Sequence, residues 1–181
     1  MKLINLFGSF FLVILLVSFL GCAPTATKEG TGEYIDDSVI TTKVKAVILK
    51  EGSLKSTEIN VETFKGVVQL SGFVNSQADI NKAIEVTRSV KGVRSVTNSM
   101  RIKQESSSAG EYIDDAAITT KVKAAILQEG SLKSTEINVE TFKGVVQLSG
   151  FVNSQADINK AVEVTRNVKG VKSVTNSMRL K

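Results

Sequence analysis

Residues 58–74 read EINVETFKGVVQLSGFV, and this stretch determines the fold around it. Its first half alternates apolar and polar side chains, which is typical of a strand with one buried face. Residues 64–66, Phe-Lys-Gly, supply a turn in which the glycine adopts a positive φ. Residues 67–73 alternate again, with Val68 and Leu70 on the buried side. The short spacing between the two runs predicts an antiparallel hairpin.

Helical patterns flank the hairpin on both sides. Upstream, Asp36 or Asp37 can cap a helix, because a carboxylate accepts the free N–H groups at the positive helix end. Gly52 can end that helix in the left-handed conformation. Downstream, Ser76 and Asp79 have the spacing of a capping box. The two apolar stripes consist of Ile40, Val44, Val47 and Ile48, and of Ile80, Ala83, Ile84, Thr87 and Val90.

A third alternating run follows the second helix. Val96, Met100 and Ile102 share one side, and Thr97, Ser99 and Arg101 share the other. The order is therefore helix, strand, strand, helix, strand. Because two apolar stripes can cover one face of a sheet, we expect an α+β module of αββαβ type with a three-stranded mixed sheet. The second face of that sheet is expected to be polar and exposed to water.

The whole pattern occurs twice. Residues 32–103 and 110–181 align without a gap at an offset of 78, and 64 of the 72 paired positions are identical. The differences are Ser38/Ala116, Val39/Ala117, Val47/Ala125, Lys50/Gln128, Ile84/Val162, Ser89/Asn167, Arg94/Lys172 and Ile102/Leu180. We expect two tandem modules at residues 33–103 and 111–181, joined by a flexible linker at residues 104–110. Two independent modules on a string are favoured over a solenoid.

The N-terminus has the layout of a targeting signal. One lysine precedes a long apolar stretch, as in secretory signals. Residues 19–22, Phe-Leu-Gly-Cys, resemble the bacterial lipobox, and Cys22 is the only cysteine of the chain. The sequence predicts a lipoprotein signal peptide at residues 1–21, acylation of Cys22 and a flexible tether at residues 22–32. An uncleaved membrane helix over residues 3–20 is the alternative.

The composition narrows the possible chemistry. The chain has no histidine, and its one cysteine lies in the targeting segment, which excludes Ser-His-Asp triads, Cys-His dyads and metal sites built on histidine or thiolate. Helix capping accounts for the paired carboxylates Asp36-Asp37 and Asp114-Asp115. We therefore expect no catalytic residue, no metal and no cofactor. The net charge of +5 is scattered among acids, and an exported chain is not expected to meet nucleic acid.

Two strings carry a specific family resemblance. The string GVVQLSGFV at residues 66–74, followed by an alanine-containing helix and VKGVRSVTN at residues 90–98, resembles the BON domain, and the second copy carries the same set. The chain thus resembles the dual-BON, OsmY-like proteins of the periplasm and outer membrane. The resemblance implies a non-enzymatic envelope lipoprotein in envelope maintenance or in osmotic and stress protection. Its implied partner is the phospholipid membrane, and its implied place is the periplasm, anchored to the outer membrane by Cys22.

Basic side chains are the candidates for binding anionic lipid, since each contributes about 1 kcal/mol near a charged membrane surface. The candidates are Lys43, Lys45, Lys121 and Lys123 on or near the first helix of each module, and Arg88, Arg166, Arg101 and Arg179 around the second helix and the last strand. The competing interpretation is that these charges solvate the surface and complement the helix dipole.

Two further alternatives stay open at this point. The protein is either a lipid binder or a periplasmic adaptor or chaperone-like protein without lipid affinity, which binds an envelope protein through the open sheet face or the edge of the last strand. The aromatic residues at the hairpin tips, Phe64 and Phe142, either insert into a membrane or a partner, or fold back onto the core.

Overall fold

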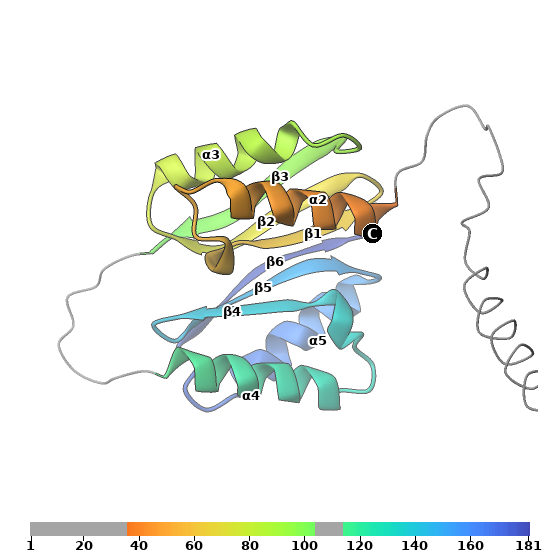
Figure 1. Cartoon of the computed structure of the whole chain (residues 1–181). Coiled ribbons are helices and arrows are strands. Elements are labelled where there is room, and N and C mark those ends of the chain that lie inside the picture. The colour runs from red at the N-terminus through yellow and green to blue at the C-terminus, as the bar shows by residue number, and fades with distance from the viewer. Residues whose placement is uncertain (1–35, 104–113) are drawn as a thin grey trace, which may run out of the picture. The chain divides into compact units, whose positions relative to one another are not determined.

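The computed structural model describes residues 36–103 and 114–181. The predicted signal peptide, Cys22, the tether and the linker at residues 104–110 lie outside the described residues. Module 1 contains α2 (Asp37–Lys50), β1 (Asn60–Phe64), β2 (Val67–Val74), α3 (Gln77–Arg88) and β3 (Ser95–Ile102) (Figure 1). Module 2 repeats this order with α4 (Asp115–Gln128), β4 (Asn138–Phe142), β5 (Val145–Val152), α5 (Gln155–Arg166) and β6 (Ser173–Leu180).

Each module contains one mixed sheet of three strands. The strand order is β1-β2-β3 in module 1 and β4-β5-β6 in module 2. The hairpin strands β1 and β2 pair antiparallel, with Val61 opposite Leu70, while β2 and β3 pair parallel, with Val68 opposite Val96. Helix α3 connects the two parallel strands, as a parallel pair requires a crossover. The predicted αββαβ modules are confirmed.

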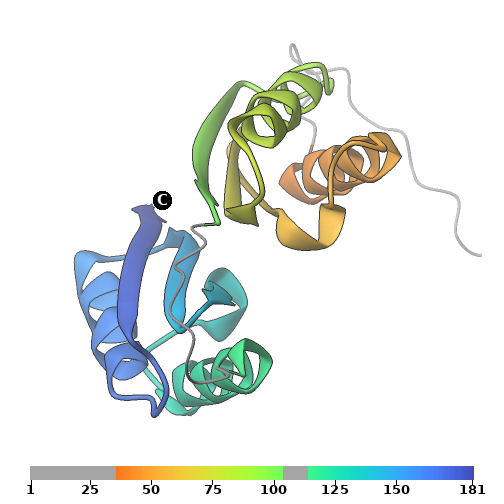
Figure 2. The ribbon, with the colours of Figure 1, turned by 90° about the vertical axis from the view of Figure 1, so that its left-hand side faces the viewer.

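Both helices of a module lie against the same face of its sheet (Figure 2). Their apolar stripes meet the inward side chains of the strands, and each module has its own core. In module 1 the fully buried members include Ile40, Val44, Ile48, Val61, Val68, Leu70 and Ala83. The stripes that the sequence predicts are therefore the ones that the core uses. Ile102, which was expected on the buried side of the last strand, is 42% exposed because it lies at the end of this edge strand.

The two neighbouring aspartates at the start of α2 have different roles. Asp36 caps the helix by accepting a hydrogen bond from the backbone N–H of Ser38 at 2.7 Å. Asp37 instead reaches the β1–β2 turn, where its two carboxylate oxygens accept from the N–H groups of Lys65 at 2.6 Å and Gly66 at 2.8 Å. Both turn residues have positive φ, 50° and 75°, as a two-residue type I′ hairpin requires. Asp37 thus ties the helix start to the hairpin.

The expectation for Gly52 is wrong. Helix α2 ends at Lys50, and the N–H of Glu51 donates to the carbonyl oxygens of Val47 and Ile48 while its own φ is −78°. The chain therefore leaves the helix through an extended residue, and no left-handed glycine is needed there. The glycine under real steric constraint is Gly72 in β2, where a Cβ would lie 2.1 Å from the carbonyl oxygen of Glu58.

The second face of the sheets is not exposed to water, contrary to the expectation from the sequence. Gln69 and Ser71 lie on that face of β2, yet they are only 1% and 2% exposed. The Oγ atoms of Ser71 and Ser149 lie 2.8 Å apart, so the second faces of the two sheets contact one another. The modules are not independent units on a string. The alternating polar pattern failed as a guide because Gln69 and Ser71 find hydrogen-bond partners in the other module.

The aromatic residues at the hairpin tips also belong to this contact. The rings of Phe64 and Phe151 have centroids 5.6 Å apart, and so do those of Phe73 and Phe142. Neither of the two alternatives for Phe64 and Phe142 is therefore correct. Each ring packs against an aromatic ring of the other module, rather than against its own core or into solvent.

Candidate functional site

The predicted basic residues all lie on the surface. Lys43 and Lys45 are on α2, Lys121 and Lys123 on α4, Arg88 and Arg166 at the ends of α3 and α5, and Arg101 and Arg179 in β3 and β6. Within the described residues, none of these eight side chains takes part in an ion pair. Their charges are therefore free to meet an external anion.

The structure brings two of the predicted arginines to one groove. Strands β3 and β6 line a shallow groove of about 480 Å³, and both Arg101 and Arg179 border it. The remaining lining is polar or apolar but uncharged, and consists of Asn98, Ser99 and Met100 with Asn176, Ser177 and Met178. Among the described residues no carboxylate lines this groove, so the two guanidinium groups set its electrostatic character.

The alternation of side chains along β3 and β6 explains why Arg101 and Arg179 both border the β3–β6 groove. Arg101 pairs in register with Phe73, and it follows Ser99 by two residues, so both share the face that contacts the other module. The backbone oxygen of Ser99 accepts a hydrogen bond of 2.6 Å from Nε2 of Gln147. The equivalent bond from Gln69 to Ser177 holds β6 in the same way. The contact between the modules therefore positions both edge strands beside the groove.

The asparagines in this groove were missed at the level of sequence. Asn98 lies between Val96 and Met100 on the side of β3 that should be apolar, and this interruption was the available signal. Its Oδ1 accepts a hydrogen bond of 2.9 Å from the backbone N–H of Met100. Asn176 does the same for Met178 in β6. Each asparagine thereby occupies a backbone donor of an edge strand.

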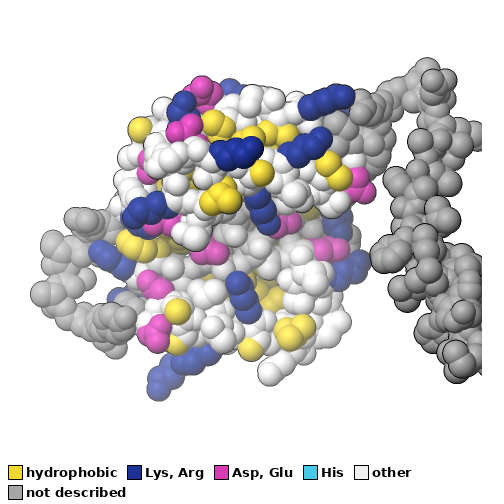
Figure 3. All heavy atoms as spheres, viewed as in Figure 1, with side chains coloured by type: hydrophobic (Ala, Val, Ile, Leu, Met, Phe, Trp, Pro, Cys, Tyr) yellow, Lys and Arg dark blue, Asp and Glu magenta, His cyan; other side chains and the backbone are white. Residues whose placement is uncertain are grey.

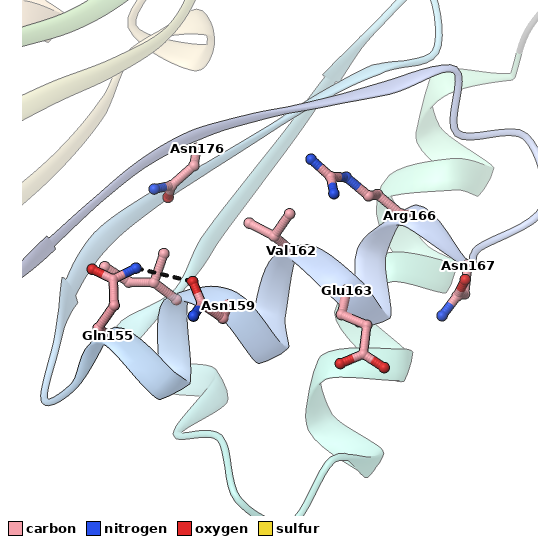
Figure 4. Close-up of a pocket in the computed structure, with 8 residues that line it drawn as sticks. Gln155, Asn159, Val162, Glu163, Arg166, Asn167 and Asn176 are labelled. Atoms are coloured by element: carbon pink, nitrogen blue, oxygen red, sulfur yellow. Dashed lines mark hydrogen bonds between the residues drawn. The ribbon is translucent and has the colours of Figure 1, made fainter.

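Arg166 lines a different groove, between α5 and β6. This groove measures about 450 Å³ and is bordered by Asn159, Val162 and Asn176 among others. Arg166 and Asn176 extend from opposite elements toward the same space (Figure 4), and Glu163 also belongs to the lining of this groove. Arg166 is thus not part of the β3–β6 groove, although Asn176 borders both.

The helix lysines do not form one patch. Lys43 and Lys45 are two positions apart, which places them about 200° apart around a helix of 3.6 residues per turn. Lys123 borders a third groove, of about 350 Å³, beside the exposed Leu127. On the face in Figure 3, the Lys and Arg side chains are dispersed among acidic and uncharged groups. The lysines therefore offer separate contacts rather than a single binding site.

The described residues carry neither a membrane span nor a metal cluster. In residues 36–103 and 114–181, no helix is long and apolar enough to cross a membrane. The same ranges contain no group of three or more His, Cys, Asp or Glu side chains that could hold a metal ion.

Comparison with known proteins places this architecture in a family. The BON domain family matches residues 36–104 and 114–181. The osmotically-inducible protein Y of Escherichia coli (strain K12) is 43% identical over 151 residues, which cover 83% of this chain and 75% of that protein. The 21 kDa hemolysin of Actinobacillus pleuropneumoniae is 33% identical over 147 residues, 81% of this chain and 75% of that protein. The outer membrane lipoprotein DolP of Haemophilus influenzae is 30% identical over 145 residues, 80% of this chain and 74% of that protein. This chain belongs to the BON domain family and carries two copies of the domain.

Proposed function

We propose that this protein is a non-enzymatic envelope lipoprotein that binds anionic phospholipid headgroups through its two BON modules. The observation that carries the proposal is the β3–β6 groove, where Arg101 and Arg179 have neither an ion pair nor a bordering carboxylate within residues 36–103 and 114–181. A guanidinium matches the oxygens of a phosphate with two parallel hydrogen bonds. Asn98, Ser99 and their counterparts add neutral donors along the same groove.

The names of the relatives support the place and the role. One is an outer membrane lipoprotein and another is osmotically inducible, which fits a protein of the periplasm that helps maintain the envelope under stress. Acylation of Cys22 anchors the chain to the outer membrane in this proposal. The helix lysines and Arg88 and Arg166 provide secondary contacts, each of about 1 kcal/mol near an anionic surface.

The adaptor alternative is less well supported. Its first surface, the open sheet face, is occupied by the contact between the modules. Its second surface, the edge of the last strand, has a central backbone N–H already bonded to Asn98 or Asn176. A partner strand would have to displace these side chains before it could pair.

Vesicle co-sedimentation tests the proposal. The chain without residues 1–22 is mixed with vesicles of phosphatidylglycerol or phosphatidylcholine over a salt series. We expect binding to phosphatidylglycerol that weakens with salt, because exposed charges are screened. Replacing both arginines, Arg101→Gln with Arg179→Gln, removes about 2 kcal/mol and weakens binding roughly 30-fold.

The matched control removes the same charge elsewhere. Lys55 and Lys133 are exposed and paired with Glu58 and Glu136, so Lys55→Gln with Lys133→Gln tests the effect of net charge alone. We expect a much smaller loss for this pair. Equal losses in the two double variants would show that the groove is not the site. Absence of binding to any vesicle at low salt would refute lipid recognition.

A further inference from the structure

The contact between the two modules is reciprocal. Nε2 of Gln69 donates to the oxygen of Ser177 at 2.6 Å, and Nε2 of Gln147 donates to the oxygen of Ser99 at the same distance. The backbone N–H of Gly72 donates to Oε1 of Gln147 at 2.9 Å, and that of Gly150 donates to Oε1 of Gln69 at 2.9 Å. The Ser71–Ser149 pair is its own counterpart. Such exchange of equivalent contacts defines an isologous interface with local two-fold symmetry.

The residues of this interface are the same in both modules. The contacting positions in module 1 are Phe64, Gln69, Ser71, Gly72, Phe73, Ser99 and Lys103, and each has an identical counterpart 78 residues later. None of the eight positions at which the modules differ is among them. A module therefore presents to its partner the same surface that it receives, and nothing in these contacts distinguishes module 1 from module 2.

An unpaired module is poorly suited to water on this face. Gln69 is 1% exposed and Phe73 is 8% exposed in the paired chain, so separation uncovers an aromatic ring and leaves the glutamine without its cross-module partners. The burial of the Phe73 ring stabilises the paired state, and the Gln69 amide makes all of its hydrogen bonds only in that state. Both effects therefore favour pairing.

We infer that this face, formed by β1, β2 and β3 or by β4, β5 and β6, is self-complementary, and that the partner it fits is a second copy of this chain. Module 1 pairs with another module 1, and module 2 with another module 2, through the contacts that join the two modules of one chain. Two chains thus form a dimer by exchanging modules. In dilute solution the closed chain dominates, because a short linker gives the neighbouring module an effective concentration in the millimolar range.

Cleavage between the modules tests the inference. A recognition sequence for a site-specific protease is inserted after Ser106 in the full chain, and the purified protein is cut and examined by native mass spectrometry. The two halves differ in mass, so each pairing is identified directly. Self-complementarity predicts the pairs 1–1, 1–2 and 2–2 in proportions of about 1:2:1. Recovery of the 1–2 pair alone, or of single halves at tens of micromolar, overturns the inference.

A variant locates the pairing surface. Ser71→Asp with Ser149→Asp places two like charges where the hydroxyl oxygens lie 2.8 Å apart. We expect all three pairs to be lost after cleavage, while circular dichroism shows that the halves keep their helices. Persistence of the pairs in this variant would assign them to another surface and overturn the inference.

A second measurement needs no cleavage. The intact chain is refolded from urea at about 1 mM, close to the effective concentration within one chain, and also at a thousandfold dilution. Size-exclusion chromatography with light scattering is expected to give exchanged dimers at the high concentration and monomers at the low one. An exclusively monomeric product at both concentrations contradicts the inference, whatever the lipid assay gives.

Discussion

At the scale of single residues, Gly72 allows strand β2 to lie directly against the backbone that precedes β1. Gly72 has a φ of 118°, a conformation that side chains with a Cβ rarely adopt, and the space beside it is filled by the backbone of Glu58. A backbone oxygen cannot move aside as the end of a flexible side chain does. This position therefore excludes every residue except glycine.

We expect Gly72→Ala to destabilise the fold by more than about 2 kcal/mol, because backbone strain and the clash with Glu58 add together. Urea denaturation followed by circular dichroism measures the loss. Gly52→Ala is the control, since no atom lies within 4 Å of the added Cβ, and its effect should stay within about 1 kcal/mol. A small effect at Gly72 would mean that the backbone of β2 can relax.

The N-terminal cap of α2 contributes a pH-dependent stabilisation, and one of the hydrogen bonds behind it is specific to module 1. The hydroxyl and the backbone N–H of Ser38 both bond to Asp36, and these bonds hold the pKa of this exposed carboxyl below its usual value of about 3.9. A lowered folded-state pKa means that the stabilisation is present above the unfolded value and is lost as the pH falls through the folded one. In module 2 the residue equivalent to Ser38 is Ala116, which has no hydroxyl.

We expect Ser38→Ala to move the pKa of Asp36 back toward its usual value, because the larger of its two stabilising bonds is removed. An NMR titration of the carboxyl carbon between about pH 2 and 6 reports it directly. An unchanged titration in this variant would show that the backbone N–H alone sets the pKa. Thr42, whose hydroxyl bonds the carbonyl oxygen of Ser38, offers Thr42→Ala as a neighbouring control.

At the scale of elements, the start of α2 and the β1–β2 turn are held together by Asp37. Its carboxylate bonds two successive N–H groups at a turn whose residues both have positive φ. Asp115 makes the same two bonds at 2.6 and 2.8 Å in module 2. The aspartate therefore fixes the helix relative to the hairpin, in addition to lying favourably in the first turn of the helix.

We expect Asp37→Ala to cost about 2 kcal/mol, since hydrogen bonds to a charged group contribute more than neutral ones. Asp115→Ala should cost the same, and thermal unfolding of the two variants provides the comparison. Ser53→Ala removes an exposed hydroxyl that bonds only Glu51 and should change stability by less than about 0.5 kcal/mol. Unequal losses at Asp37 and Asp115 would contradict an equivalent role in the two modules.

The elements were predictable because their signals are local. The alternation around Lys65-Gly66, the box at Ser76 and Asp79 and the two apolar stripes each lie within a few residues, and the structure uses all of them. The separate roles of Asp36 and Asp37 were not predictable, because Asp37 bonds residues that follow it by 28 and 29 positions. Spacing in the sequence does not reveal which of two adjacent carboxylates points toward a distant turn.

At the scale of the whole molecule, the contact between the modules rests on buried amides. Gln69 gives one hydrogen bond to Ser177 and receives one from Gly150, and Gln147 makes the reciprocal pair. The polar residues of this face alternate along β2 as they do on a solvated sheet. The warning signal was that Phe64 and Phe73 share that face, which is unusual for a surface in contact with water.

The arginine groove depends on the same contact, so it could not be read from one module. Arg101 and Arg179 were predicted as candidates, but the sequence separates them by 78 residues and does not show that they border one groove. The helix lysines differ from the arginines in this respect. They are close in sequence, but the helical geometry separates them.

We expect Gln69→Ala to destabilise the chain by about 3 kcal/mol, because the buried N–H of Gly150 loses its acceptor and the oxygen of Ser177 loses a donor. Gln147→Ala should give the same loss. The free energy of unfolding from urea titration provides the measurement, with Gln77→Ala as the control, since Gln77 is exposed and bonds only Asn81. If Gln69→Ala matched that control, the modules would not depend on this contact.

The asparagines that bond the backbone of the last strands have a consequence for solubility. An uncovered strand edge can recruit further strands and so start ordered aggregation. Asn98 and Asn176 each occupy a backbone donor in the middle of β3 and β6. An incoming strand must displace these asparagines before it can pair at the centre of the edge, which makes edge-to-edge aggregation less favourable.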